Sequence, residues 1–351
     1  MTMELTQLLG TELPVIQAPM AGVQGSALAV AVCNAGGLGS LPCAMLGPQA
    51  MREELAAIRA QTSRPFNVNF FCHRPPQPSE EREAAWRAAL APYFAEMGID
   101  PGAIAAGPAR RPFGAEALEV LAEFRPPLVS FHFGLPAADL LARVRGWGAK
   151  VLSSATTLAE ALWLQAQGVD AIIAQGLEAG GHRGHFMSGE LHAQLGTFAL
   201  VPQIARAVRI PVVAAGGIAD ARGVAAAIAL GASGVQAGTA YLLCPEATTS
   251  AVHRAALKSQ AAEHTALTNL FTGRPARGIV NRLMRELGPL SDLAPEFPLA
   301  GAAVAPLRAK AEAAGSGDFS PLWAGQLAPA CREVPAARLT RELAAAITAP
   351  R

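Results

Sequence analysis

Amide side chains recur at the ends of short apolar runs in this sequence. Gln17 lies in VIQAPM, Asn69 in FNVNFF, Gln175 in AIIAQG and Gln236 in GVQAG. An amide donates and accepts hydrogen bonds at once, so such a set suits the nitrogen and oxygen edge of a flavin ring. For any single amide, the alternative is a side chain that only holds a loop.

One histidine lies inside such a run. His132 stands in LVSFHFG, and in a strand its neighbours Phe131 and Phe133 would point to the opposite side. A neutral imidazole in an apolar pocket can act as a general base near neutral pH. The alternative is a hydrogen-bonded core histidine.

Glycines follow the last two runs, in AAGGIAD and VQAGTAY. Residues such as Gly217 and Gly238 allow the backbone to approach a ligand closely. The helices that follow would offer unpaired N–H groups to a phosphate. Tight turns are the alternative, but two glycine turns in succession favour a phosphate site.

The loop Glu178 to Phe186, EAGGHRGHF, carries His182 and His185. Two histidines three residues apart with no third ligand are weak evidence for a metal, so we expect no metal and a loop that covers a cofactor. The run ends lack paired carboxylates and any His/Asp/Glu cluster. This argues against a glycosidase and against a metallohydrolase. Met20 is a candidate for packing on a ring face.

Eight apolar runs must position these residues. They begin near Val15, Leu38, Phe66, Leu128, Lys150, Ala171, Val212 and Gly234. Runs that are apolar at consecutive positions suit strands buried on both faces of a parallel sheet. Ala/Leu-rich stretches separate them, for example TTLAEALWLQAQG and DARGVAAAIALG, with cap residues at the start and glycine at the end.

Eight strand–helix units predict an α/β fold, a (β/α)8 TIM barrel, with the chemistry at the carboxyl ends of its strands. We expect the barrel to span residues 1–244, with an insertion at about 72–127 after the third strand. Residues 245–351 are expected to form a mostly helical extension that completes the substrate site. A doubly wound open sheet is the alternative fold, but no G-x-G-x-x-G follows the first run.

Composition narrows the classes of protein. The chain has 351 residues, 51% hydrophobic, with 28 Lys+Arg against 27 Asp+Glu. This is not the composition of a disordered chain, and the balanced charge gives no reason to expect nucleic acid or an anionic membrane surface as a partner. The uncharged stretch 13–51 is broken by Pro and Gly, so we read it as buried strands and turns rather than a membrane helix. Five cysteines without C-x-x-C, and an N-terminus without a signal-peptide pattern, suggest a cytoplasmic protein.

Taken together, these motifs resemble the nitronate monooxygenases, formerly 2-nitropropane dioxygenases, of class I type. The matching stretches are PVIQAPMAGV, NAGGLGSL, PFNVNFF, VSFHFGLP, AIIAQGLEAGGHRG, PVVAAGGIAD, GVQAGTAYL and DFSPLWAGQ. QAPMAG and EAGGH are shared with flavin-dependent enoyl-acyl-carrier-protein reductases and NADH:quinone reductases of the same barrel superfamily. SFHFG and DFSPLWAGQ discriminate better.

The resemblance implies a barrel that binds FMN without a covalent link, with His132 as the catalytic residue. The implied cofactor contacts are Met20, Asn69, Gln175, Gly180, Gly217, Gln236, Ala237, Gly238 and Thr239. The implied reaction is oxidation of alkyl nitronates by O₂ to a carbonyl compound and nitrite, through one-electron transfer to the flavin. Propionate 3-nitronate, a metabolic poison, is the substrate usually linked to the family. With neutral nitroalkanes, His132 would first remove the α-proton.

The chain also departs from the family's pattern. Family members often place Tyr and Lys near the substrate, whereas this chain has only Tyr93, Tyr241 and a possible Lys310. Arg274, Arg277 and Arg282 are further cations of the C-terminal part. The alternatives are an NAD(P)H-dependent flavin reductase of quinones or enoyl thioesters, and a flavin-binding barrel with little catalysis. Either a monomer or a homodimer fits the sequence.

Overall fold

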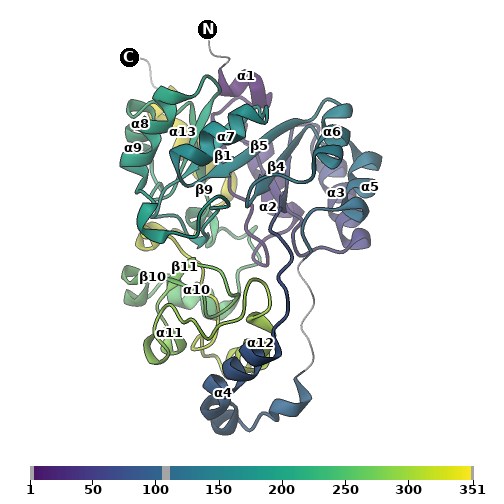
Figure 1. The fold of residues 1–351 in the computed structure, drawn as a ribbon. Coiled ribbons are helices and arrows are strands. Elements are labelled where there is room, and N and C mark those ends of the chain that lie inside the picture. Colours follow the sequence, from purple (N-terminus) through teal and green to yellow (C-terminus); the bar gives the residue numbers. More distant parts are fainter. Residues whose placement is uncertain (1–3, 105–110, 349–351) are drawn as a thin grey trace.

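The eight apolar runs form one sheet of eight parallel strands, which confirms the predicted barrel (Figure 1). The computed structural model describes residues 4–104 and 111–348. The sheet order is β1-β9-β8-β6-β5-β4-β3-β2, and a parallel bridge between Ile16 and Leu38 joins its two edges. The strands are β1 (Val15–Gln17), β2 (Ser40–Pro42), β3 (Asn67–Phe71), β4 (Leu128–His132), β5 (Lys150–Ala155), β6 (Ala171–Gln175), β8 (Val212–Ala215) and β9 (Gly234–Ala237).

Helices surround this sheet. They are α2 (Ser26–Asn34), α3 (Pro48–Gln61), α5 (Ala115–Phe124), α6 (Ala138–Gly146), α7 (Leu158–Ala166), α8 (Thr197–Ala207), α9 (Ala221–Ala229) and α13 (Ala336–Thr348). The predicted caps are present: the Thr157 side chain accepts a hydrogen bond from the Glu160 N–H, and the Asp220 side chain accepts one from the Gly223 N–H. Each cap satisfies an N–H group that has no partner within its own helix.

The amino-terminal end of the barrel is closed by α1 (Leu5–Leu9). Leu5, Leu8 and Leu9 belong to one buried cluster with inward-facing strand residues such as Ile16 and Leu152. Apolar side chains therefore fill this end, and polar chemistry is confined to the opposite, carboxyl end.

A second lobe lies below the barrel in the view of Figure 1 and contains segments far apart in sequence. Its elements are α4 (Glu80–Met97), η1 (Pro101–Ala103), α10 (Ala251–Leu257), η4 (Gln260–Glu263), β10 (Thr265–Thr268), β11 (Ala276–Ile279), α11 (Arg282–Glu286) and α12 (Gly301–Ala313). The short strand β7 (Gly181–His182), from the loop after β6, pairs with β11. Two further 3₁₀ turns are η2 (Leu191–Ala193) and η3 (Thr239–Tyr241), and a third, η5 (Ala328–Ala330), precedes α13.

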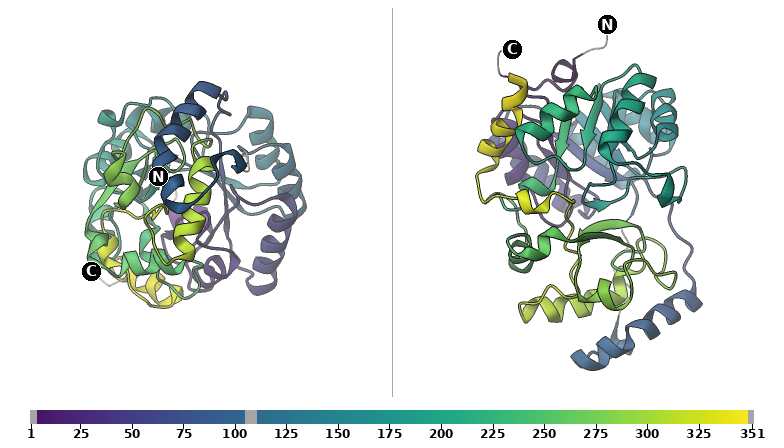
Figure 2. Two further views of the ribbon diagram at one scale, coloured as in Figure 1. Left: turned by 90° about the horizontal axis from the view of Figure 1, so that it is seen from below. Right: turned by 90° about the vertical axis from the view of Figure 1, so that its left-hand side faces the viewer.

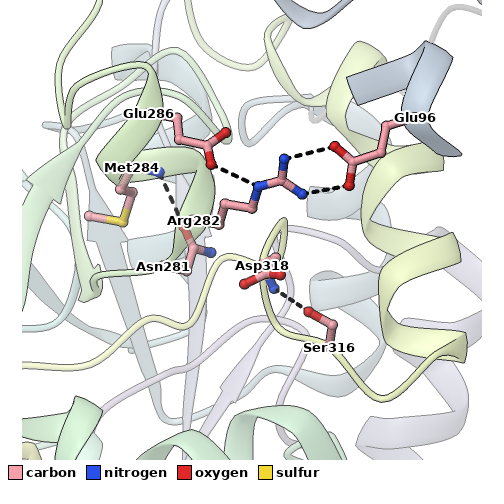
Figure 3. Close-up of polar contacts among 7 residues, drawn as sticks. All are labelled: Glu96, Asn281, Arg282, Met284, Glu286, Ser316 and Asp318. Carbon is pink, nitrogen blue, oxygen red and sulfur yellow. Dashed lines mark hydrogen bonds and ion pairs between the residues drawn. The ribbon is translucent and has the colours of Figure 1, made fainter. Parts of the chain in front are cut away.

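The insertion after β3 supplies α4, which packs against α12 in the second lobe (Figure 2). Arg282, at the start of α11, donates to both carboxylate oxygens of Glu96 at 2.7 Å and to Glu286 at 2.9 Å (Figure 3). Its guanidinium also lies 5.5 Å from the centre of the Tyr93 ring. Arg282 therefore joins the insertion to the C-terminal part of the chain.

Residues 245–348 are divided between the second lobe and the barrel. They build most of the second lobe, including the antiparallel pair β10–β11, and then return to the barrel as α13. This helix packs against α9, α2 and β1. The last described helix consequently lies on the barrel beside the N-terminal part of the chain (Figure 1). Among the helices of the described ranges, none has the length and apolar character to cross a membrane.

Candidate active site

A cavity of about 210 Å³ lies at the carboxyl ends of the barrel strands, facing the second lobe. All ten residues predicted for the site line it, namely Met20, Asn69, His132, Gln175, Gly180, Gly217, Gln236, Ala237, Gly238 and Thr239. They come from six different strands or the loops that follow them. The parallel arrangement brings these ends together, because all strands of the sheet point the same way.

His132 ends β4, and both of its ring nitrogens have partners. Nδ1 lies 2.6 Å from the Ser154 hydroxyl oxygen on β5, and Nε2 lies 3.2 Å from the carbonyl oxygen of His182. The His182 carbonyl can only accept, so it favours the tautomer in which Nε2 carries the proton, while Nδ1 accepts from the Ser154 hydroxyl. A proton taken up at Nδ1 would then find the Ser154 hydroxyl oxygen as its acceptor.

Burial is the largest influence on this imidazole and lowers the pKa of His132 to about 3. The His182 carbonyl acts in the opposite direction, and the charges of Arg274 and Arg183 lower the pKa further. His132 is therefore neutral at pH 7, as a general base must be.

The amide side chains singled out from the sequence make different hydrogen bonds. Gln175 bonds the loop that follows it, donating to the His182 carbonyl at 3.0 Å and accepting from the Gly184 N–H at 2.8 Å. Asn69 donates to the Ser130 hydroxyl and carbonyl. Gln17 does not line the cavity: it is fully buried, accepts a hydrogen bond from the Ser40 N–H and donates one to Gln24. The reading of Gln17 as a ligand-facing amide was wrong, because the β1–β2 contact uses its side chain.

The β8 and β9 ends offer unused hydrogen-bonding groups. Within the described ranges, the N–H groups of Gly217, Thr239 and Ala240 donate no hydrogen bond, and Gln236 Oε1 is buried without a partner. Gly217 has a φ of +68°, which glycine adopts without strain. Side-chain atoms are absent from Gly238, where an added Cβ would lie 3.2 Å from the Cβ of Ala18. Free N–H donors, an orphaned amide oxygen and open backbone are what an anionic, ring-containing cofactor such as FMN requires.

Comparison with known proteins gives the family. A family model for nitronate monooxygenase matches residues 2–346. A nitronate monooxygenase of Pseudomonas aeruginosa is 47% identical over 351 residues, which cover 98% of each chain. One of Paraburkholderia phytofirmans is 45% identical, over 97% of this chain and 93% of its own.

The chain belongs to the nitronate monooxygenase family.

Membership of the nitronate monooxygenase family makes the chain an enzyme, an oxidoreductase, and confirms the resemblance found in its motifs. A solved structure of nitroalkane oxidase from Streptomyces ansochromogenes is 41% identical, with a TM-score of 0.88 over 98% of this chain and 97% of its own. The structure of FabK from Thermotoga maritima is 27% identical, with a TM-score of 0.72 over 98% and 95%.

In this member of the nitronate monooxygenase family, further residues line the cavity that the sequence did not single out as site residues. They are Phe71, His253 and Trp323, among others, beside Ser154 at the end of β5 and His182 of the predicted covering loop. Phe71 lies two positions after Asn69 on the same face of β3, and Trp323 lies in the DFSPLWAGQ motif, so both had a signal in the sequence. His253 had none, because α10 reaches the cavity only through the tertiary fold.

The lysines, the arginines and the tyrosine that the structure describes in the second half of the chain do not line the cavity. Tyr241 is buried and hydrogen-bonded to Thr340 at 2.9 Å, and Lys310 bonds the Met97 carbonyl on the far side of the second lobe. Arg277 donates to the Leu177 carbonyl at 3.0 Å. No lysine or arginine is among the described residues that line the cavity. Nor do residues 4–104 and 111–348 contain three or more His, Cys, Asp or Glu arranged to hold a metal ion.

Proposed function

We propose that this protein is an FMN-dependent enzyme that oxidises alkyl nitronates with O₂ to a carbonyl compound and nitrite. The observation that carries the proposal is one cavity in which a neutral histidine, His132, lies together with free N–H donors at Gly217 and Thr239. The histidine can remove a proton from a carbon acid, and the N–H groups can bind the phosphate of a cofactor. The relatives named nitronate monooxygenase and nitroalkane oxidase support the same chemistry.

Each part of the site has a proposed task. The glycine turns at Gly217 and Gly238 would hold the phosphate of FMN, and Gln236 would hydrogen-bond the ring through Oε1. Met20 and Ala237 would pack against the cofactor, and the Gly180 backbone would approach it from the loop. FMN, when bound, supplies the one-electron acceptor that nitronate oxidation needs.

His132 matters for one class of substrate. A neutral nitroalkane must lose its α-proton before oxidation, and the neutral imidazole of His132, which lines the cavity, would accept it. In the resulting imidazolium, Nε2–H would donate to the His182 carbonyl, 3.2 Å away, and Nδ1–H to the Ser154 hydroxyl oxygen, 2.6 Å away. A nitronate has already lost that proton, so we expect it to react without a base.

We also propose that residues 245–351 complete the substrate side of the site. Trp323, beside the cavity, lies 5.5 Å from His182 between ring centres, and His253 contributes from α10. Propionate 3-nitronate remains the substrate to test first, together with an uncharged-tail nitronate such as ethyl nitronate.

The test is oxygen uptake by the purified protein loaded with FMN, on addition of each nitronate and without NAD(P)H. We expect rapid uptake and release of nitrite. Absence of uptake while FMN stays bound would contradict the proposal. It would favour an NAD(P)H-dependent flavin reductase, the second candidate that the shared QAPMAG and EAGGH motifs keep open. Anaerobic bleaching of the flavin by NADH or NADPH would then identify that activity.

A further inference from the structure

Phe133, the residue after His132, has an unusual backbone conformation. Its φ is +69°, in the left-handed region that a bulky aromatic residue rarely adopts. In the described ranges, one other non-glycine residue has a positive φ, Arg125 at the end of α5. Strain of this kind persists where surrounding contacts enforce it, and it gathers at functional sites.

The contacts of the Phe133 ring show what enforces it. The ring centre lies 4.5 Å from that of His132 and 4.8 Å from that of Phe71. On the Phe133 ring rests the Arg274 guanidinium, whose central carbon is 4.1 Å from the ring centre. This is a close cation–π contact, so the ring is held between an arginine and the candidate base.

Arg274 also fixes the loop on the other side of His132. Its guanidinium donates to the carbonyls of Arg183 and His185. The same loop presents the His182 carbonyl to Nε2 of His132. One side chain therefore contacts the residue that follows His132 and the loop that faces its Nε2.

The charge of Arg274 has no close partner. Within the described ranges, no carboxylate lies within ion-pair distance of Arg274, and its hydrogen-bond acceptors are neutral carbonyls. Burial lowers the pKa of Arg274 to about 10, so the side chain is still cationic at pH 7. A buried cation without an ion-pair partner disfavours a second positive charge nearby.

We infer that Arg274 is a positioning residue for proton transfer at His132: it holds Phe133 and the loop 182–185 against the imidazole, and its positive charge adds to the burial that disfavours a protonated imidazole. This inference rests on the proposed function, because it concerns the base that acts on neutral nitroalkanes.

Other groups around His132 also influence the protonation of its imidazole. From the loop after β6, Arg183 and His185 act in the same direction as Arg274, whereas the His182 carbonyl favours a proton on the ring. On β5 the neighbour is the Ser154 hydroxyl, and on the β3 side it is Cys72, whose N–H donates to the His132 carbonyl. Glu160 interacts with Arg183 and Arg274 through space.

The decisive experiment replaces the cation and measures the pH profile of kcat/KM with a neutral nitroalkane. In Arg274→Gln, the limb at which activity falls with decreasing pH should move upward by about one pH unit, toward the ordinary value for histidine. Arg274→Lys keeps the charge and should keep the limb near its original position. Turnover of a preformed nitronate, which needs no base, should change by less than about twofold.

Arg277→Gln is the matched control, because Arg277 is also a buried arginine bonded to backbone carbonyls on the same segment, yet it does not appear among the charges that act on His132. In Arg277→Gln, the pH at which kcat/KM falls should be the same as in the wild type. An unchanged limb in Arg274→Gln, or an equal shift in Arg277→Gln or Arg274→Lys, would overturn the inference.

A second measurement does not depend on turnover. NMR titration of the His132 imidazole, assigned with His132→Asn, should show its pKa higher in Arg274→Gln than in the wild type. Should Arg274→Gln not fold, Phe133→Leu removes the ring under the guanidinium. That variant should lose about tenfold in nitroalkane turnover and keep nitronate turnover. If the wild type itself fails to oxidise nitronates, the proposed function is wrong, while the titration still tests the electrostatic part of the inference.

Discussion

At the scale of single residues, the site depends on a histidine that the fold keeps neutral. His132 is surrounded by apolar rings and by two arginines, and these surroundings lower its pKa. The Ser154 hydroxyl on Nδ1 and the His182 carbonyl near Nε2 fix the plane of the ring.

Replacing this histidine should separate the two kinds of substrate. We expect His132→Asn to lower turnover of a neutral nitroalkane by about 10²–10⁴-fold, because general base catalysis contributes about that much. Turnover of the corresponding nitronate should persist. Steady-state oxygen uptake with both substrates at equal flavin content measures the ratio. Equal losses with both substrates would show that His132 is not a base.

A glycine close to His132 gives a second, steric prediction. A Cβ added at Gly184 would lie 2.7 Å from His132 Cε1 and 2.8 Å from the Ser154 hydroxyl oxygen. Gly184→Ala should therefore displace the imidazole and lower nitroalkane turnover by about 10²-fold, the usual cost of a misplaced catalytic group.

Gly189→Ala is the control for Gly184→Ala, since an added Cβ there meets nothing within 4 Å. It should behave like the wild type in the same assay. Full nitroalkane activity in Gly184→Ala would mean that the imidazole position is not critical.

At the scale of elements, the last helix of the chain, α13, contacts the barrel close to the cavity. It closes the ring of barrel helices, and its Thr340 hydroxyl meets the Tyr241 hydroxyl at 2.9 Å. Tyr241 belongs to η3, which directly follows the proposed phosphate-binding turn after β9. The last helix therefore supports, from behind, the part of the cavity proposed to bind the cofactor.

Removing one partner of this buried pair should destabilise the protein. Thr340→Val keeps the side-chain shape but leaves the Tyr241 hydroxyl buried without its partner, at a cost of about 1–3 kcal/mol in the free energy of unfolding. Urea denaturation of the single variants and of Thr340→Val with Tyr241→Phe provides the measurement. Because the double variant removes both hydroxyls, it should lose less than the sum of the two single variants. Strict additivity would show that the two hydroxyls do not stabilise each other.

At the scale of the whole molecule, burial of histidines makes stability depend on pH. Burial lowers the pKa of His132 and of His185 to about 3, and that of His253 to about 4, from an ordinary value of 6.5. The unfolded chain therefore binds protons on these residues at a pH where the folded protein does not. The resulting stabilisation is complete above pH 6.5 and is lost as the pH falls toward the folded values.

Below pH 6.5, each of these histidines should remove about 1.4 kcal/mol of unfolding free energy for every unit of decreasing pH. Chemical denaturation between pH 7.5 and pH 5 measures the slope. His253→Gln removes one titrating group and should make the slope shallower by about one proton. A profile that is flat across this range would show that the histidines are not buried as described.

The sequence by itself determined the barrel, the family and ten of the residues that line the cavity. Local patterns were enough there, because each apolar run makes its own strand and parallel strands must end at one edge. Only the tertiary structure decided which polar groups are free. Gln17 and Gln175 have the same side chain, yet the first bonds inside the β1–β2 contact and the second braces the loop before Gly184. Arg274 and His253 come from the second lobe, far along the chain, and reach the region of His132 through packing between the two lobes. Side-chain partners across such distances depend on the packing of whole elements, which no local pattern in the sequence records.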